Sequence, residues 1–233
     1  SAAMGRSRVV LVILVGALGG CQALPAPLAE PTGPPASSQS EMAPADLPPR
    51  DTLTALPSRS SVQPHVSEQL AQYLAVTDAI TSRGGTNPEE IAGLVTPDWL
   101  EDEYRGFAEF ERQRIRTLGK TSHRHLLVQS VQQSADGGID VAVFSCVDTR
   151  SVWVVPTDAP EPPEDLRQWL DEGSPALTEG EEFPEPWQDY IETVSPSPGG
   201  IDPVLLWFRG TDERALTLDF TDTWRGHHPC DGH

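Results

Sequence analysis

The chain has 233 residues, and its 16 Lys and Arg side chains are outnumbered by 35 Asp and Glu side chains, which gives a formal net charge of −19. Binding to nucleic acid or electrostatic attraction to anionic lipid requires basic patches, so this charge argues against both. The length is ample for one hydrophobic core with extended segments beside it.

An N-terminal signal peptide is predicted for residues 1–20. Two arginines precede an apolar run at 9–18. That run is too short to cross a bilayer, which takes about 20 residues, and it has the length of a signal-peptide core. Residues 1–3 come before Met4, and we expect them to be a cloning remnant.

The end of this segment, Leu18-Gly19-Gly20-Cys21, resembles the lipobox of bacterial lipoproteins. The resemblance implies cleavage before Cys21 and acylation of its thiol with diacylglycerol, with palmitate as a typical chain. The lipid would anchor the protein at the outer face of the cytoplasmic membrane. Two alternatives stay open: an ordinary signal peptide followed by a chance cysteine, and an N-terminal anchor that is never cleaved.

Residues 21–64 are predicted to form a linker between Cys21 and a folded domain at 65–230. The segment is rich in Pro, Ala and Ser and has no hydrophobic period. Its prolines interrupt helices, and such compositions are typical of extended, semi-rigid spacers. The linker would hold the domain away from the membrane.

Three helical segments are predicted next. The first starts near His65, with Ser67 as its cap, and places its apolar residues on one face. The second, at 87–95, begins with Asn followed by Pro, and the third, at 96–118, begins with Thr followed by Pro. Gly119 suits the left-handed cap of the third helix.

The hydrophobic period then changes from 3.6 to 2, which indicates strands. The predicted strands lie at 125–133, 139–148, 152–155, 204–209 and 216–220, and Asp136-Gly137 forms a hairpin turn. Helices followed by antiparallel strands predict an α+β domain, with the N-terminal helices packed on one curved antiparallel sheet.

An acidic insertion at 156–200 interrupts the strands and contains two short helical candidates, at 166–170 and 187–191. Its aromatic residues are expected to fold back on the sheet, although docking of a partner is an alternative; they are Trp169, Trp187 and Tyr190. The acidic residues could bind Ca²⁺, but the spacing of a calcium loop is missing, so a solvated loop is favoured.

The order of elements resembles the NTF2-like fold, a curved antiparallel sheet wrapped around N-terminal helices. The stretch at 141–148, followed by Trp224 and Cys230, looks like small secreted actinobacterial lipoproteins of unknown function. The single lysine and the abundance of Ala, Gly and Pro agree with a GC-rich genome. The resemblance covers about residues 65–230 and implies a conical pocket between sheet and helices, without implying an activity.

Three cysteines are present. If Cys21 carries lipid, Cys146 and Cys230 remain as an even pair in an oxidising compartment. A single disulfide between them is the simplest interpretation, and two separate buried thiols are the alternative.

Candidate metal ligands are restricted to histidines. His123 and His125 would share a strand face, and His227, His228 and His233 follow near the C-terminus. Because no carboxylate or free cysteine lies at a recognised ligand spacing near them, surface histidines are the favoured interpretation, and no metal site is predicted.

A candidate pocket residue is Asp148, which could act as a general base beside His125 or Tyr104. The favoured alternative is that Asp148 accepts hydrogen bonds from the turn amides at Thr149-Arg150. The sequence lacks a nucleophile elbow, a phosphate loop and a zinc motif, so no catalytic residue and no cofactor are predicted.

These patterns predict a surface-tethered, non-catalytic domain that binds a small molecule or a protein. A small isomerase or hydrolase that uses the pocket is one alternative. A structural subunit of an envelope complex is the other.

Overall fold

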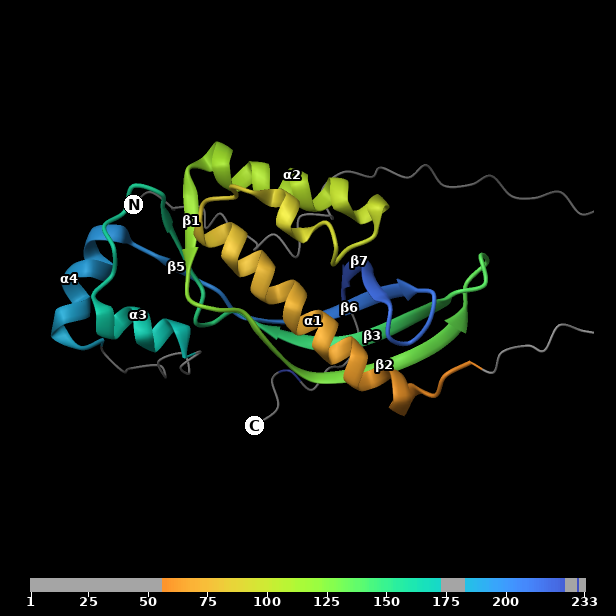
Figure 1. Cartoon of the computed structure of the whole chain (residues 1–233). Helices are drawn as coiled ribbons and strands as arrows, with labels where there is room; N and C mark the ends of the chain where they lie inside the picture. The colour runs from red at the N-terminus through yellow and green to blue at the C-terminus, as the bar shows by residue number, and fades with distance from the viewer. Residues whose placement is uncertain (1–55, 173–182, 225–229, 231–233) are drawn as a thin grey trace, which may run out of the picture. The chain divides into compact units, whose positions relative to one another are not determined.

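The computed structural model describes residues 56–172, 183–224 and 230. The expected signal peptide, Cys21, most of the expected linker and the C-terminal histidines at 227, 228 and 233 lie outside these residues. The described residues form an α+β fold with two antiparallel sheets and helices beside them (Figure 1).

The first helix, α1 (Arg59–Ser82), begins earlier than the predicted start near His65 and includes the end of the expected linker. The Ser58 hydroxyl caps it by accepting a hydrogen bond from the Ser61 amide at 3.1 Å. Pro64 removes one helical hydrogen bond, but Val62 is fully buried, and this burial holds the first turns on the domain.

The second predicted helix is a short 3-10 helix, η2 (Pro88–Ile91), and the expected Asn87 cap is absent. Asn87 has a left-handed backbone with φ of 59°, so its side chain does not cap the helix. The third predicted start is confirmed in α2 (Pro97–Gln113), where the Thr96 hydroxyl accepts a hydrogen bond from the Trp99 amide at 3.4 Å.

The predicted end of this helix at 118 was wrong. The helix ends at Gln113, Arg114 takes the left-handed conformation, and the next residues form β1 (Ile115–Leu118). This strand pairs antiparallel with β4 (Trp153–Pro156), so long-range pairing prevails over the local helical period.

The larger sheet has four strands in the order β2–β3–β6–β7, and α1 and α2 lie over one of its faces (Figure 1). The strands are β2 (Ser122–Gln133), β3 (Ile139–Asp148), β6 (Ile201–Gly210) and β7 (Leu216–Thr223). The core between helices and sheet is filled by large apolar side chains, including Leu70, Phe107 and Phe208.

Phe220 does not follow the predicted alternation of β7. Its side chain is 42% exposed, whereas Leu216 and Leu218 are buried. A register irregularity opposite Trp207 and Phe208 places one extra residue in β7, so Phe220 does not continue the buried row of Leu216 and Leu218. Its ring packs edge-on against Trp99 of α2, with centroids 5.8 Å apart.

The expected single sheet is in fact two, and neither is closed. The smaller sheet has the order β1–β4–β5, with β5 at Ser197–Pro198, and it packs against α3 (Glu164–Asp171) and α4 (Glu185–Val194). Both helices predicted in the acidic insertion are therefore present. Trp169, Trp187 and Tyr190 fold back as expected, but onto the smaller sheet, where Trp153 joins them.

Cys146 of β3 and Cys230 form a disulfide, with α-carbons 5.6 Å apart. The pair packs with Phe144, Ile201 and Trp224. The bridge therefore attaches Cys230 to a central strand of the larger sheet. Within the described residues, no helix has the length and apolar character needed to cross a membrane.

Candidate functional site

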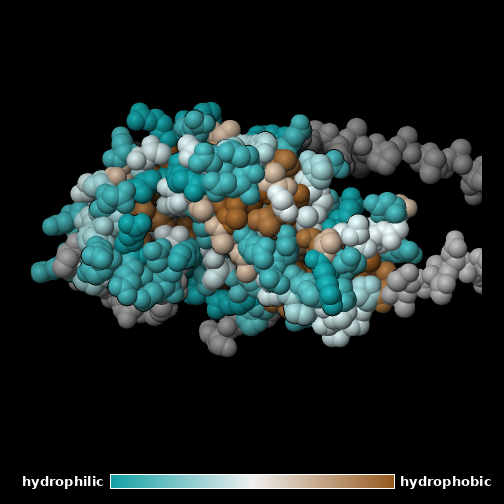
Figure 2. Space-filling model, in the orientation of Figure 1, coloured by the Kyte–Doolittle hydropathy of each residue, from teal (hydrophilic) through white to brown (hydrophobic). Residues whose placement is uncertain are grey.

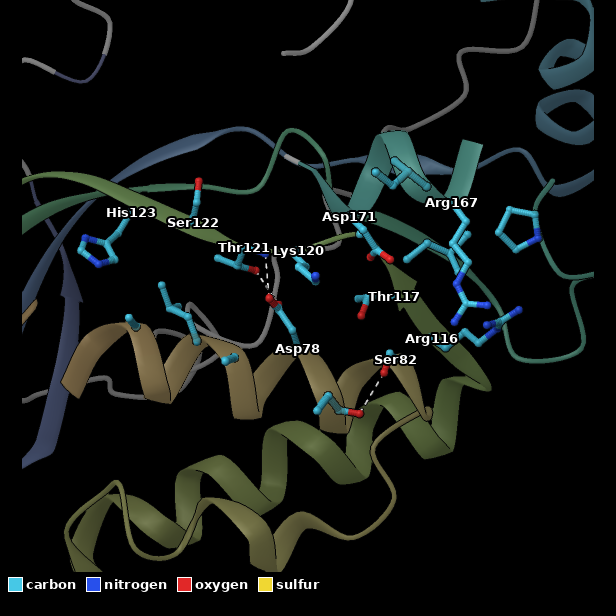
Figure 3. A pocket seen from close by; sticks show the side chains of 18 of the residues that line it. Asp78, Ser82, Arg116, Thr117, Lys120, Thr121, Ser122, His123, Arg167 and Asp171 are labelled. Atoms are coloured by element: carbon cyan, nitrogen blue, oxygen red, sulfur yellow. Dashed lines mark hydrogen bonds between the residues drawn. The ribbon is translucent and has the colours of Figure 1, made fainter. Parts of the chain in front are cut away.

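A cavity of about 690 Å³ lies between α1, the segment from β1 to the start of β2, and α3 (Figure 3). It is outside the main core, and it was not predicted from the sequence. Its polar lining comes from Asp78 and Ser82 of α1, from residues 116–123, from Glu161, and from Arg167 and Asp171 of α3. The volume is within the range of 300–1,000 Å³ that small-molecule sites occupy.

The wall formed by α1 owes its shape to small side chains. Ala71, Ala75 and Ala79 follow one another at intervals of four, so they share one face of the helix. The opposite face carries Leu70 and Tyr73 into the main core. Figure 2 shows apolar surface over α1 with hydrophilic side chains around it.

Asp78 joins α1 to the start of the larger sheet. One carboxylate oxygen accepts a hydrogen bond from the Thr121 amide at 2.7 Å, and the other accepts one from the Thr121 hydroxyl at 2.6 Å. Burial raises the pKa of Asp78 to about 6, although these hydrogen bonds and the charge of Lys120 act in the opposite direction. Asp78 therefore changes charge in mildly acidic solution.

Three basic side chains line the cavity. Arg116 donates hydrogen bonds to the Glu161 carboxylate at 3.1 Å and to the Ala159 carbonyl at 3.4 Å, and its Nε is buried without an acceptor. Lys120 and Arg167 form no salt bridge with any other described residue. In Figure 3, Arg116 and Arg167 lie at the end of the cavity away from His123.

The connection between β1 and β2 is held in a fixed position by Gly119. Its φ is +86°, and an added Cβ would lie 2.0 Å from the Ser151 carbonyl oxygen. The Ser151 hydroxyl donates to the Lys120 carbonyl at 3.0 Å. Gly119 is thus required for close approach to the β3–β4 turn, and it positions Lys120 and Thr121 at the cavity.

His123 is half-buried at the other end of the cavity. Burial lowers its pKa, while a hydrogen bond to the Ser67 backbone acts in the opposite direction, so the imidazole is mainly neutral at pH 7. Asp78 is bonded to Thr121, and no hydrogen bond joins Asp78, Ser122 and His123 among the described residues. The cavity thus shows no nucleophile–base pair of the kind that covalent catalysis uses.

The three pocket residues expected from the sequence come from different places and do not line this cavity. Tyr104 packs against the main core, and His125 is exposed with φ of 53° where the register of β2 is irregular. This irregularity also breaks the shared face expected for His123 and His125. The described residues contain no group of three metal-ligand side chains.

Asp148 has the turn role that the sequence favoured. Its carboxylate accepts hydrogen bonds from the Arg150 amide at 3.2 Å, from the Arg150 guanidinium at 2.7 Å and from Arg124 at 2.8 Å. Burial raises the pKa of Asp148, but the bonds from Arg150 and the charge of Arg124 together outweigh it, so the net shift is downward. An ionised carboxylate with these partners is a poor general base.

Sequence analysis missed one buried carboxyl group. Glu103 of α2 is 2% exposed, and its Oε1 accepts hydrogen bonds from the Tyr73 hydroxyl and the Trp99 indole, each at 2.7 Å. Burial raises its pKa, and these two bonds oppose that shift. The acidic residue within the apolar face formed by Trp99, Phe107 and Phe110 was the available signal, and the contact ties α1 to α2.

Comparison with known proteins identifies no relative by sequence. No protein-family model matches the chain, and no curated protein matches it. Among solved structures, the intermembrane-space region of the chloroplast protein ARC6 is 8% identical, with a TM-score of 0.39, and the match covers 70% of this chain and 97% of that one. A protein from Catenulispora acidiphila is 12% identical, with a TM-score of 0.36 and coverage of 70% and 92%. Scores this low carry no conclusion about function.

Proposed function

We propose that this protein is a lipid-anchored lipoprotein on the outer side of the cytoplasmic membrane, and that its NTF2-like domain binds a small molecule without catalysing a reaction. The observation that carries the proposal is the cavity of about 690 Å³, lined by both apolar and charged side chains. The lipobox-like segment ending at Cys21 supports the anchor.

The binding site in this proposal differs from the conical pocket that the NTF2-like resemblance implies. The space between α1, α2 and the larger sheet is occupied by the main core, including Leu70, Phe107 and Phe208. The small α1 side chains at 71, 75 and 79 leave room on the other side of the helix. Binding therefore takes place between α1 and the smaller sheet with its helix α3.

A binding role is favoured over the isomerase or hydrolase alternative because the polar groups of the cavity lack a catalytic arrangement. The pKa of Asp78, raised to about 6 by burial, would suit a general base. Both of its oxygens, however, already accept hydrogen bonds from Thr121. In this position the carboxylate holds the cavity wall together.

A cavity-filling variant tests the proposal. Wild-type protein, Ala75→Trp and the control Ala108→Trp would be compared by thermal shift against a library of uncharged, cationic and anionic small molecules. Ala75 lines the cavity, and Ala108 is exposed on α2. We expect compounds that stabilise the wild type and Ala108→Trp but not Ala75→Trp.

Two results would contradict binding in the cavity: a library without any stabilising compound, or stabilisation that persists in Ala75→Trp. A pull-down of the membrane-extracted protein addresses the structural-subunit alternative. That alternative would be favoured if other proteins were recovered in a stoichiometric assembly and no small molecule bound.

A further inference from the structure

The carboxylate of Asp78 lines the cavity and is held by neutral groups. Its two oxygens accept hydrogen bonds from the amide and the hydroxyl of Thr121, and Asp78 forms no salt bridge with another described residue. We infer that the cavity is a proton-linked binding site, in which an uncharged ligand binds together with a proton that Asp78 takes up. This inference rests on the proposed function and adds the regulation of the same site.

The position of Asp78 on α1 places its carboxyl group where a ligand would cover it. Asp78 follows Ala75 by three positions, so the two residues are neighbours on one face of the helix, and both line the cavity. Asp78 is only partly buried, and Figure 3 shows it extending from α1 to Thr121. A ligand body that lies against Ala75 therefore removes water from the carboxyl group.

Loss of this water favours the protonated carboxyl group. Burial has already raised the pKa of Asp78 from 3.8 to about 6. Complete burial of a carboxyl group raises its pKa by up to about 3–5, so an uncharged ligand would bring the pKa of Asp78 to about 7 or above. At pH 7 the group would then be mainly ionised in the empty cavity and largely protonated beneath the ligand.

The other titratable and charged groups of the cavity do not oppose this change. They are two acids, three bases and one histidine: Glu161, Asp171, Arg116, Lys120, Arg167 and His123. The charge of Lys120 lowers the pKa of Asp78, but burial outweighs it. Because an uncharged ligand adds no charge to this set, the removal of water decides the direction, whereas a cationic ligand would favour the ionised carboxylate.

Thr121 can bond to the carboxyl group of Asp78 in either protonation state, because a hydroxyl group both donates and accepts. In the ionised state the Thr121 hydroxyl donates to one carboxylate oxygen at 2.6 Å. When a proton binds to that oxygen, the carboxyl group can donate to the hydroxyl instead, and the other oxygen still accepts from the Thr121 amide. Protonation therefore preserves both contacts between α1 and the start of β2.

Carbon-13 NMR titration of the carboxyl groups in the full chain tests the inference with a side chain in place of the ligand. Ala75→Leu and Ala75→Trp place apolar atoms beside Asp78, Ala108→Trp is the control on α2, and Asp78→Asn identifies the signal. We expect a midpoint of about 6 in the wild type and the control, and a midpoint at least about one pH unit higher in Ala75→Trp, with Ala75→Leu between them. A midpoint that does not rise in either Ala75 variant would overturn the inference.

Binding at two pH values tests the linkage directly. Uncharged compounds that stabilise the wild type but not Ala75→Trp would be titrated by calorimetry at pH 5.5 and pH 7.5. Because the bound state holds the proton more tightly, we expect the wild type to bind at least about fivefold more tightly at pH 5.5. Asp78→Asn keeps an oxygen that can accept from the Thr121 amide, and its affinity should be the same at both pH values.

The failure of the linkage and the failure of the proposed function give different results. Affinity that is independent of pH in the wild type, or equally dependent on pH in Asp78→Asn, would overturn the inference and leave the proposed function standing. A library in which only charged compounds bind in the cavity would do the same. If no compound binds there, the proposed function and the inference both fall.

Discussion

At the scale of single side chains, Asp78 shows how packing changes the chemistry of a residue. Its place on α1 would leave an isolated helix with an ordinary exposed acid. Packing of α1 against the start of β2 buries the carboxyl group, supplies two hydrogen bonds from Thr121 and raises its pKa to about 6. The charge state at the cavity is therefore set by tertiary contacts.

The Asp78 pKa predicts a pH-dependent contribution to stability. Because the pKa is raised on folding from 3.8 to about 6, the protonated form favours the folded state. This contribution is complete below about pH 4 and is lost as the pH rises through about 6. The free energy of unfolding of the wild type relative to Asp78→Asn should therefore increase by about 1–3 kcal/mol between pH 7 and pH 4.

Urea unfolding at a series of pH values measures this difference. Asp189→Asn is the control, because Asp189 is exposed on α4. If the free energies of unfolding of the wild type and Asp78→Asn differed by the same amount at every pH, the prediction would be contradicted.

Glu103 is a second side chain whose role depends on burial. Glu103→Ala would leave the Tyr73 hydroxyl and the Trp99 indole without their acceptor and would open a small void. We expect the free energy of unfolding to fall by about 2–4 kcal/mol. Glu103→Gln keeps an acceptor oxygen, so its free energy of unfolding, measured with urea, should fall clearly less than that of Glu103→Ala. Equal decreases for the two variants would show that the hydrogen bonds to Tyr73 and Trp99 are not responsible.

At the scale of secondary-structure elements, the β1–β2 connection determines the cavity. Gly119 has φ of +86° and closely approaches Ser151, whereas Gly137 has φ of +90° in open space. Gly137→Ala should cost only the strain of the left-handed backbone, about 1 kcal/mol. Gly119→Ala adds a steric clash with a backbone carbonyl and should cost at least about 2 kcal/mol more.

Thermal and urea unfolding of the two glycine variants measure this contrast. The Gly119→Ala protein should also lose binding in the cavity, because Lys120 and Thr121 follow directly. Equal stability of the two variants would mean that the connection can move away from Ser151.

The disulfide is an element-scale constraint as well. Cys146 and Cys230 are separated by 84 positions, and in the chain-entropy model a loop of this length contributes roughly 4 kcal/mol. Cys230→Ser should lower the free energy of unfolding by up to that amount. Non-reducing mass spectrometry of the protein, expressed in a host with an oxidising export compartment, should find no free thiol at either position, and two free thiols would contradict the prediction.

At the scale of the whole molecule, Cys21 is the residue on which the proposed location depends. Cys21→Ser removes the thiol that would carry the lipid, so the variant should accumulate unprocessed or be released from the membrane fraction. Fractionation and intact-mass measurement of the expressed protein check this. A serine variant that is cleaved normally and retained in the membrane would contradict lipidation.

Local patterns were enough to predict several features of this protein. They predicted the start of α2, because Thr96 and Pro97 have intrinsic preferences for these positions, and the strand at 139–148 with its hairpin partner. They also predicted both helices of the acidic insertion. Each of these features rests on neighbouring residues whose dihedral preferences and apolar spacing agree with the fold.

Other features depend on residues that are distant in the sequence. Residues 115–118 continue a helical pattern, but pairing with 153–156 makes them a strand. The cavity is formed by α1, residues 116–123 and α3, and its volume is the space that small side chains leave where these segments meet. The tertiary structure alone decided both, because pairing partners and unfilled space are properties of how the segments pack together.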